Sequence, residues 1–135
     1  MHKREMRGAP RVMVVEDDRA VIRMLRLALR AGGFDVEEVT DGRAALQALD
    51  EQPIDAVILD LGLPDGLAGA VLQRMRDSRP PHERALAWVV MSALDRGEAT
   101  QQYGPMGDRF VAKPFDPWDV VRLLNQQRAQ GDQEW

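Results

Sequence analysis

Five short apolar runs alternate with amphipathic segments along the chain, and this alternation restricts the fold more than any other feature. The runs at residues 12–15, 54–59 and 86–91 are largely apolar and contain many β-branched residues. Such runs are typical of strands that are covered on both faces of a parallel sheet. The run at residues 34–39 alternates polar and apolar side chains, which predicts an edge strand, and residues 110–112 form the fifth run.

The segments between these runs have the apolar spacing and end signals of helices. We predict helices at about residues 19–31, 42–50, 67–77 and 95–103, and a fifth that begins at Pro117 with Asp116 as its N-cap. Gly32 and Gly33 end the first helix, and the fourth contains few large apolar residues. The expected buried positions are Val21, Leu25, Ala28 and Leu29 in the first helix and Trp118, Val121 and Leu124 in the fifth.

Five strands alternating with five helices predict an α/β fold with right-handed crossovers. The natural arrangement is a flavodoxin-like, doubly wound, five-stranded parallel sheet with strand order 2-1-3-4-5. We expect one domain at residues 11–129, between an N-terminal tail at 1–10 and a C-terminal tail at 130–135. The competing interpretation is a fragment of a larger Rossmann-type domain.

The composition excludes several classes of protein. The chain has 135 residues, 44% of them hydrophobic and 30% charged, as expected of one soluble globular domain. It has no cysteine, so it can form no disulfide and no thiolate metal site. No apolar run approaches the roughly 20 residues that cross a bilayer, and residues 1–10 lack the apolar centre of a secretory signal. A net charge of −4 argues against general nucleic-acid binding. We therefore expect a cytoplasmic protein that contacts neither membrane nor nucleic acid directly.

In a doubly wound sheet, ligands bind beyond the carboxyl ends of the strands, where the strand order reverses. The predicted strands place carboxylates, one hydroxyl and one ammonium group at this edge. Clustered carboxylates need either protonation or a hard divalent cation, and all-oxygen ligands favour Mg²⁺, Mn²⁺ or Ca²⁺ over zinc. Asp18 alone is explained by an N-cap role. The residues that converge are Glu16, Asp17 and Asp18 after the first strand, Asp60 after the third, Ser92 after the fourth and Lys113 after the fifth.

Two of these residues differ from their surroundings. Asp60 is a carboxylate at the end of an apolar strand, where a structural role is hard to find. Lys113 is one of only two lysines among 18 cationic residues. Because arginine is larger and forked, a lysine at this position indicates a need for a compact point charge.

Four segments in this order and spacing resemble the CheY-like receiver domains of bacterial two-component response regulators. They are residues 14–18 (Val-Val-Glu-Asp-Asp), 59–64 (Leu-Asp-Leu-Gly-Leu-Pro), 90–93 (Val-Met-Ser-Ala) and 110–115 (Phe-Val-Ala-Lys-Pro-Phe). The resemblance covers about residues 11–128, and the four segments together are specific.

The resemblance implies a role for each matching residue. Asp60 corresponds to the phosphoacceptor, and Ser92 and Lys113 to the hydroxyl and the lysine that contact the phosphoryl group. The implied Mg²⁺ ligands are Glu16, Asp17, Asp60 and the backbone carbonyl of Gly62. Phe110 corresponds to the switch aromatic, which is expected to turn inward when Ser92 moves toward the phosphoryl group.

The resemblance also implies partners. The phosphoryl donor would be a phosphohistidine on a sensor histidine kinase or a phosphotransfer protein. The surface formed by the fourth helix, fifth strand and fifth helix would then bind a downstream protein target or a second copy of the chain. Beyond slow self-dephosphorylation, no enzymatic activity is expected.

Three other functions compete with this interpretation. A phosphorylation-independent scaffold with the same fold would not need the full set of acidic, hydroxyl and lysine residues. An aspartate-nucleophile phosphatase needs a second acid where this chain has Gly62. A flavin-binding protein needs a phosphate-binding loop after the first strand, where the acidic run would repel a phosphate.

Two segments depart from the family pattern. The loop at residues 65–69 has Ala68 where the family commonly has glycine. The stretch between Ser92 and Lys113 is about one residue short, so we expect a short or mobile fourth helix.

Overall fold

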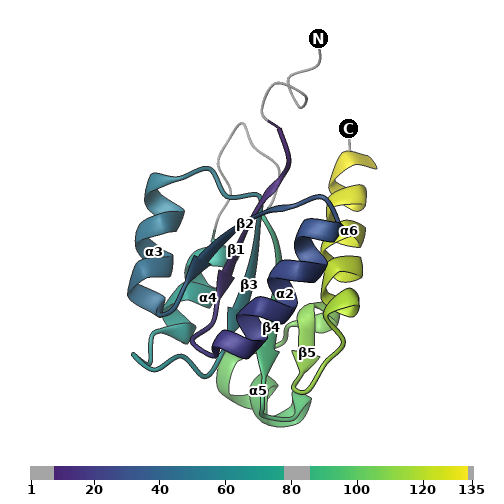
Figure 1. Cartoon of the computed structure of the whole chain (residues 1–135). Helices are drawn as coiled ribbons and strands as arrows, with labels where there is room; N and C mark the ends of the chain where they lie inside the picture. Colours follow the sequence, from purple (N-terminus) through teal and green to yellow (C-terminus); the bar gives the residue numbers. More distant parts are fainter. Residues whose placement is uncertain (1–7, 78–85, 134–135) are drawn as a thin grey trace.

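The computed structural model describes residues 8–77 and 86–133, with side chains described as far as residue 130. Its five strands form one parallel sheet with the order β2-β1-β3-β4-β5, which confirms the predicted topology (Figure 1). The strands are β1 (Arg11–Val15), β2 (Asp35–Val39), β3 (Ala56–Asp60), β4 (Ala87–Ser92) and β5 (Phe110–Ala112). The helices are α2 (Arg19–Ala31), α3 (Gly42–Glu51), α4 (Ala68–Arg76), α5 (Arg96–Tyr103), the short 3-10 helix η1 (Gly107–Arg109) and α6 (Pro117–Gln133).

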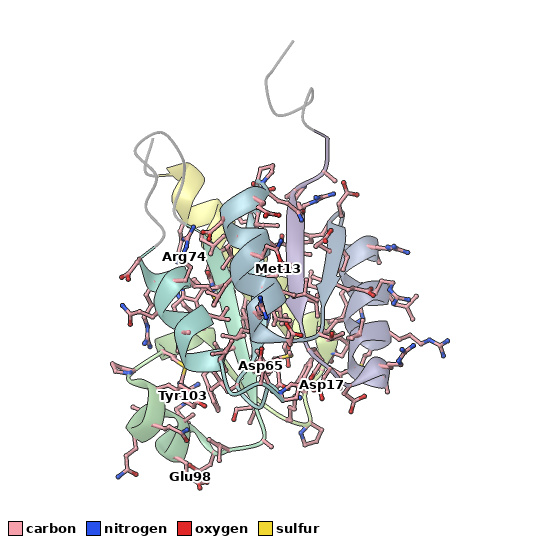
Figure 2. The ribbon with its side chains drawn as sticks, turned by 90° about the vertical axis from the view of Figure 1, so that its left-hand side faces the viewer. Met13, Asp17, Asp65, Arg74, Glu98 and Tyr103 are labelled. Carbon is pink, nitrogen blue, oxygen red and sulfur yellow. The ribbon has the colours of Figure 1, made fainter. Side chains whose placement is uncertain are left out.

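Helices cover both faces of the sheet, and each face has its own apolar core. Helices α2 and α6 pack on one face, while α3, α4 and α5 supply the core on the other (Figures 1 and 2). Alternate residues of β1 point to opposite faces: Met13 and Val15 join one core, and Val12 and Val14 join the other. This double coverage explains why β1, β3 and β4 are continuously apolar, as the sequence predicts.

Strand β2 lies at one edge of the sheet and is only partly buried, which confirms the edge strand predicted from its alternating residues. Its side chain Glu38 pairs with Arg26 of α2, and this arginine holds the pKa of the Glu38 carboxyl below its usual value. The charged positions of the edge strand thus tie it to the neighbouring helix.

The helix boundaries agree closely with the predicted ones, but one predicted core residue is exposed and another is only partly buried. Trp118 is 54% exposed, and Val120 is fully buried in its place beside Val121 and Leu124. The reason is geometric, because positions 120, 121 and 124 form a tighter face on a helix than 118, 121 and 124. In α2, Ile22 is likewise buried where Val21 is only partly buried.

Helix α5 has a single buried residue, Ala99, which agrees with the weak apolar pattern of this segment. Its start is nevertheless well defined, because Asp95 and Glu98 form a capping box. Helix α6 continues to Gln133, beyond residue 129, where we expect the domain to end. Within the described residues, no helix combines the length and apolar character required to span a bilayer.

Candidate metal and phosphoryl site

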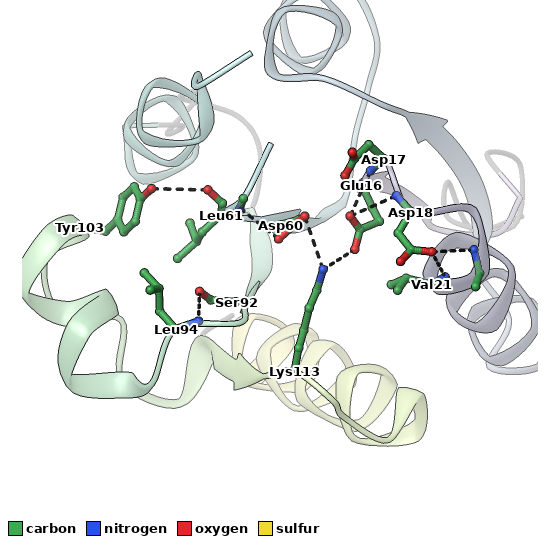
Figure 3. A network of polar contacts seen from close by, with 12 residues as sticks. Glu16, Asp17, Asp18, Val21, Asp60, Leu61, Ser92, Leu94, Tyr103 and Lys113 are labelled. Atoms are coloured by element: carbon green, nitrogen blue, oxygen red, sulfur yellow. Dashed lines mark hydrogen bonds and ion pairs between the residues drawn. The ribbon is translucent and has the colours of Figure 1, made fainter. Parts of the chain in front are cut away.

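The carboxyl ends of β1, β3 and β5 bring three predicted site residues into contact (Figure 3). The Lys113 ammonium lies 2.7 Å from Oε1 of Glu16 and 3.4 Å from Oδ2 of Asp60. Glu16 is fully buried, Asp60 is 5% exposed, and the Lys113 side chain is 24% exposed. One lysine therefore bridges two buried carboxylates that are 44 positions apart in the sequence, one at the end of each neighbouring strand.

The same acids are held by backbone donors of their own loops. The amide of Asp17 donates to Oε2 of Glu16 at 3.0 Å, and the amide of Asp18 donates to the same oxygen at 3.4 Å. The amide of Gly62 donates to Oδ1 of Asp60 at 3.1 Å. Asp18 itself accepts from the amides that follow it and caps α2, as predicted. The carboxylates are thus fixed in position before any ligand arrives.

The acids and the lysine change one another's proton affinity. Burial, followed by the hydrogen bond with Asp60, raises the pKa of Glu16 from 4.5 to about 7, and Lys113 only partly opposes this. Burial lowers the pKa of the Lys113 ammonium, but its contacts with Glu16 and Asp60 outweigh burial and raise it. The lysine therefore stays charged, and the three carboxyl groups of Glu16, Asp17 and Asp60 outnumber it.

The geometry fits a hard divalent cation. Carboxylate oxygens of Glu16, Asp17 and Asp60 lie within 4.8 Å of one another, and Asp17 is exposed at the mouth of the site. Gly62 lies directly beside them, because a Cβ atom on this residue would be 3.6 Å from Oδ1 of Asp60. The three carboxylates offer an all-oxygen donor set of the kind that Mg²⁺ prefers, and the Lys113 ammonium compensates part of their charge.

Ser92 and Lys113 are joined through the backbone at the neighbouring strand ends. Ser92 is 3% exposed, and the amide of Lys113 donates to its carbonyl at 2.8 Å. The Ser92 hydroxyl accepts a hydrogen bond from the amide of Leu94 at 3.0 Å. In Figure 3, Asp60 and Lys113 lie between Ser92 on one side and Glu16 and Asp17 on the other. The peptide bond from Lys113 to Pro114 is cis, a point that the sequence leaves open.

Phe110, which the family resemblance suggests as the switch aromatic, lies in the apolar core. It is only 6% exposed and belongs to the core beneath α3, α4 and α5. The Arg96 guanidinium lies over its ring at 5.1 Å, and Nη1 of Arg96 also donates to the carbonyl of Gly107 at 2.7 Å. The aromatic ring is thus already inward, and an arginine from α5 covers it.

Sequence reasoning missed two residues that hold the surroundings of the site. Arg96 links the start of α5 to η1 by its hydrogen bond with Gly107 and to the start of β5 by its contact with Phe110, and Asp65 links the loop after β3 to the start of α3. The contacts of Asp65 join segments that are more than 20 positions apart in the sequence. The Asp65-Gly66 pair signals only a turn, so no local pattern could have revealed the second link.

A family model for the response regulator receiver domain matches residues 12–125. The transcriptional regulatory protein KdpE of Mycobacterium tuberculosis H37Rv is 36% identical over 104 residues, which cover 77% of this chain and 44% of that protein. The DNA-binding response regulator MtrA of Mycobacterium leprae is 31% identical over 125 residues, or 92% of this chain and 53% of that protein. The chain thus spans about half the length of the curated relatives it matches.

Solved structures show the same fold. A CheY-like receiver domain protein from Methanospirillum hungatei has a TM-score of 0.76 at 18% identity, covering 95% of this chain and all of that one. A sensor protein from Polaromonas has a TM-score of 0.72 at 31% identity, covering 90% of this chain and 98% of that one. Because the family model matches most of the sequence and the fold agrees, the chain belongs to the response regulator receiver domains, the phosphorelay modules of two-component signalling.

Proposed function

We propose that Asp60 is the phosphoacceptor of this receiver domain. One observation carries the proposal: a buried carboxylate at the end of a central strand, 3.4 Å from a lysine ammonium and beside two further acids. A carboxylate held in this way is oriented for in-line attack on phosphorus and partly shielded from water. The reaction would form a bond between an Asp60 oxygen and phosphorus, while the bond from phosphorus to the donor imidazole breaks.

The surrounding residues would stabilise the transferred group. The Lys113 ammonium would form an ion pair with a phosphoryl oxygen, and its present contact with Asp60 would weaken in return. The Ser92 hydroxyl, which now accepts from Leu94, can donate its own proton to a second phosphoryl oxygen. Phosphoryl transfer consists mostly of positioning and charge stabilisation, so these contacts account for what the chain must supply.

Glu16, Asp17, Asp60 and the carbonyl of Gly62 would hold Mg²⁺. The ion would neutralise charge on the phosphoryl oxygens as they approach the acidic cluster. Support comes from the all-oxygen donor set and from the excess of negative charge that Lys113 leaves uncompensated.

The partners follow from the family and are part of the proposal. The donor would be a phosphohistidine on a sensor histidine kinase or a phosphotransfer protein, and the changed surface would be that of α5, β5 and α6. That surface would bind a downstream protein or a second copy of this chain. The names of KdpE and MtrA refer to transcription and DNA binding by whole proteins, of which this chain spans about half. We further propose a cytoplasmic location and no turnover of an external substrate.

The experiment is phosphorylation by acetyl phosphate with Mg²⁺, read by intact mass. The wild-type chain should gain the mass of one phosphoryl group, and this gain should disappear with EDTA. Asp60→Asn should gain nothing, while Asp55→Asn, at the opposite end of β3, serves as a matched control and should label normally. Acid-stable labelling of the Asp60→Asn protein would assign the phosphoryl group to another residue, and an unlabelled wild type would favour a phosphorylation-independent scaffold.

A further inference from the structure

The segment after Asp60 has to present a backbone carbonyl toward the metal. Gly62 is exposed and has no side chain to anchor it, while Leu61 and Leu63 on either side are buried. On the Asp60 side, the amide of Leu61 donates to the carbonyl of Met91 at 2.9 Å. The position of the Gly62 carbonyl therefore also depends on what holds the chain on its other side, in residues 63–67.

Asp65 fixes this part of the loop against the start of α3. Its Oδ1 accepts from the amides of Gly42 and Leu67, both at 3.2 Å, and its Oδ2 accepts from the amide of Arg43 at 3.0 Å. Its slight burial would raise the pKa of the Asp65 carboxyl, but the backbone donors outweigh this and lower it, so the group is ionised at neutral pH. In Figure 2, Asp65 lies at the site-facing end of α3, on the same side of the molecule as Asp17.

The two segments also touch through their backbones. A Cβ atom on Gly42 would lie 2.5 Å from Cβ of Leu67 and 3.2 Å from Oδ1 of Asp65. Only glycine lets the start of α3 approach the loop this closely. The turn itself is closed by a hydrogen bond from the amide of Gly66 to the carbonyl of Leu63 at 3.2 Å, with Gly66 at φ +72°. The loop is therefore clamped against α3, and Asp65 and Gly42 form the clamp.

We propose that Asp65 is a positioning residue for the metal: with Gly42, it clamps residues 62–67 against α3 so that the Gly62 carbonyl faces the acidic cluster. This rests on the proposed Mg²⁺ site.

The choice of metal gives a specific consequence. Mg²⁺ demands nearly octahedral coordination at short distances, whereas Ca²⁺ accepts irregular coordination and longer bonds. A loosened Gly62 carbonyl should therefore weaken Mg²⁺ binding more than Ca²⁺ binding. Loss of a negative charge near the site should weaken both ions alike. The ratio of the two dissociation constants separates positioning from electrostatics.

The experiment is calorimetric titration of the whole chain with Mg²⁺ and, separately, with Ca²⁺. Asp65→Asn places an amide NH₂ against a backbone N–H and breaks part of the clamp. Gly42→Ala pushes the loop away and changes no charge. Each variant should raise the Mg²⁺ dissociation constant about tenfold, as is usual for residues that orient a ligand, and the Ca²⁺ constant by less.

Asp41→Asn is the matched control, because it removes a charge at the same helix start and asparagine caps as well as aspartate. It should leave the Mg²⁺ to Ca²⁺ ratio unchanged. Wild-type affinity and ratio in the two clamp variants, or an equal loss of both ions, would overturn the positioning role while leaving the metal site intact. A wild-type chain that binds no Mg²⁺ would instead overturn the site on which the inference rests. Asp65 is exposed, so Asp65→Asn is expected to fold even where Gly42→Ala is destabilised.

Discussion

Burial of Glu16 should make the stability of this protein fall as the pH rises from about 4.5 to about 7 when no metal is present. The pKa of Glu16 is 4.5 in an unfolded chain and about 7 in the folded one, because burial and the neighbouring Asp60 favour the protonated form. Between these values the folded state binds more protons than the unfolded state, so folding weakens as protons are removed. A tenfold change in proton affinity is worth about 1.4 kcal/mol, so the total loss should be roughly 3 kcal/mol.

The assay is urea unfolding in EDTA at pH 5, 6, 7 and 8. The free energy of unfolding should decrease across this range, with most of the loss below pH 7. Glu16→Gln cannot ionise and should remove most of this slope. The comparison is needed because the chain also has two histidines, and histidine side chains ordinarily titrate in this range. Parallel pH profiles for the wild type and Glu16→Gln would refute the reasoning.

Since Mg²⁺ needs the ionised carboxylate, saturating Mg²⁺ should stabilise the protein more at pH 8 than at pH 5.

Two substitutions test other contacts. The Gln127 side chain of α6 accepts from the Trp88 amide and donates to the Trp88 carbonyl, both at 2.8 Å, so Gln127→Leu leaves two peptide groups of β4 unpaired. It should cost about 2–4 kcal/mol in urea unfolding, whereas the exposed neighbour Gln126→Leu should cost almost nothing; equal costs would contradict this. Lys113→Gln should slow labelling by acetyl phosphate about a hundredfold without unfolding the chain, and wild-type labelling rates would remove the lysine from the mechanism.

Most of the fold could be predicted because its cause is local. The continuous apolar runs predict the central strands, and the alternating run predicts the edge strand. Capping residues such as Asp18 and Asp116 predict where helices begin. The site followed from topology alone, since parallel strands end at one edge of the sheet. Glu16 and Asp60 therefore meet although 43 residues separate them in the sequence.

The remaining features depend on contacts that no local pattern encodes. Trp118 fits an apolar stripe with Val121 and Leu124, but Val120 forms a tighter face with the same two residues and is buried instead; both faces are apolar in the sequence, and packing against the sheet selects the tighter one. Asp65 accepts hydrogen bonds from Gly42 and Arg43, which precede it by 23 and 22 positions. The sequence does not show which donors such a carboxylate binds, because any nearby N–H group could serve. In both cases, contacts between elements that are distant in sequence determine the outcome.

The resting position of Phe110 changes where a switch in this protein should be sought. The Phe110 ring is buried and lies beneath Arg96, so we expect the arginine to move with the ring if the ring takes part in a switch. The Ser92 hydroxyl accepts from the Leu94 amide, two residues before Arg96 begins α5. A hydroxyl drawn toward a phosphoryl group would strain or break that bond and shift the start of the helix, and with it the arginine over the ring. We therefore expect the β4–α5 connection, and not only the aromatic side chain, to transmit a phosphorylation signal to the surface of α5 and β5.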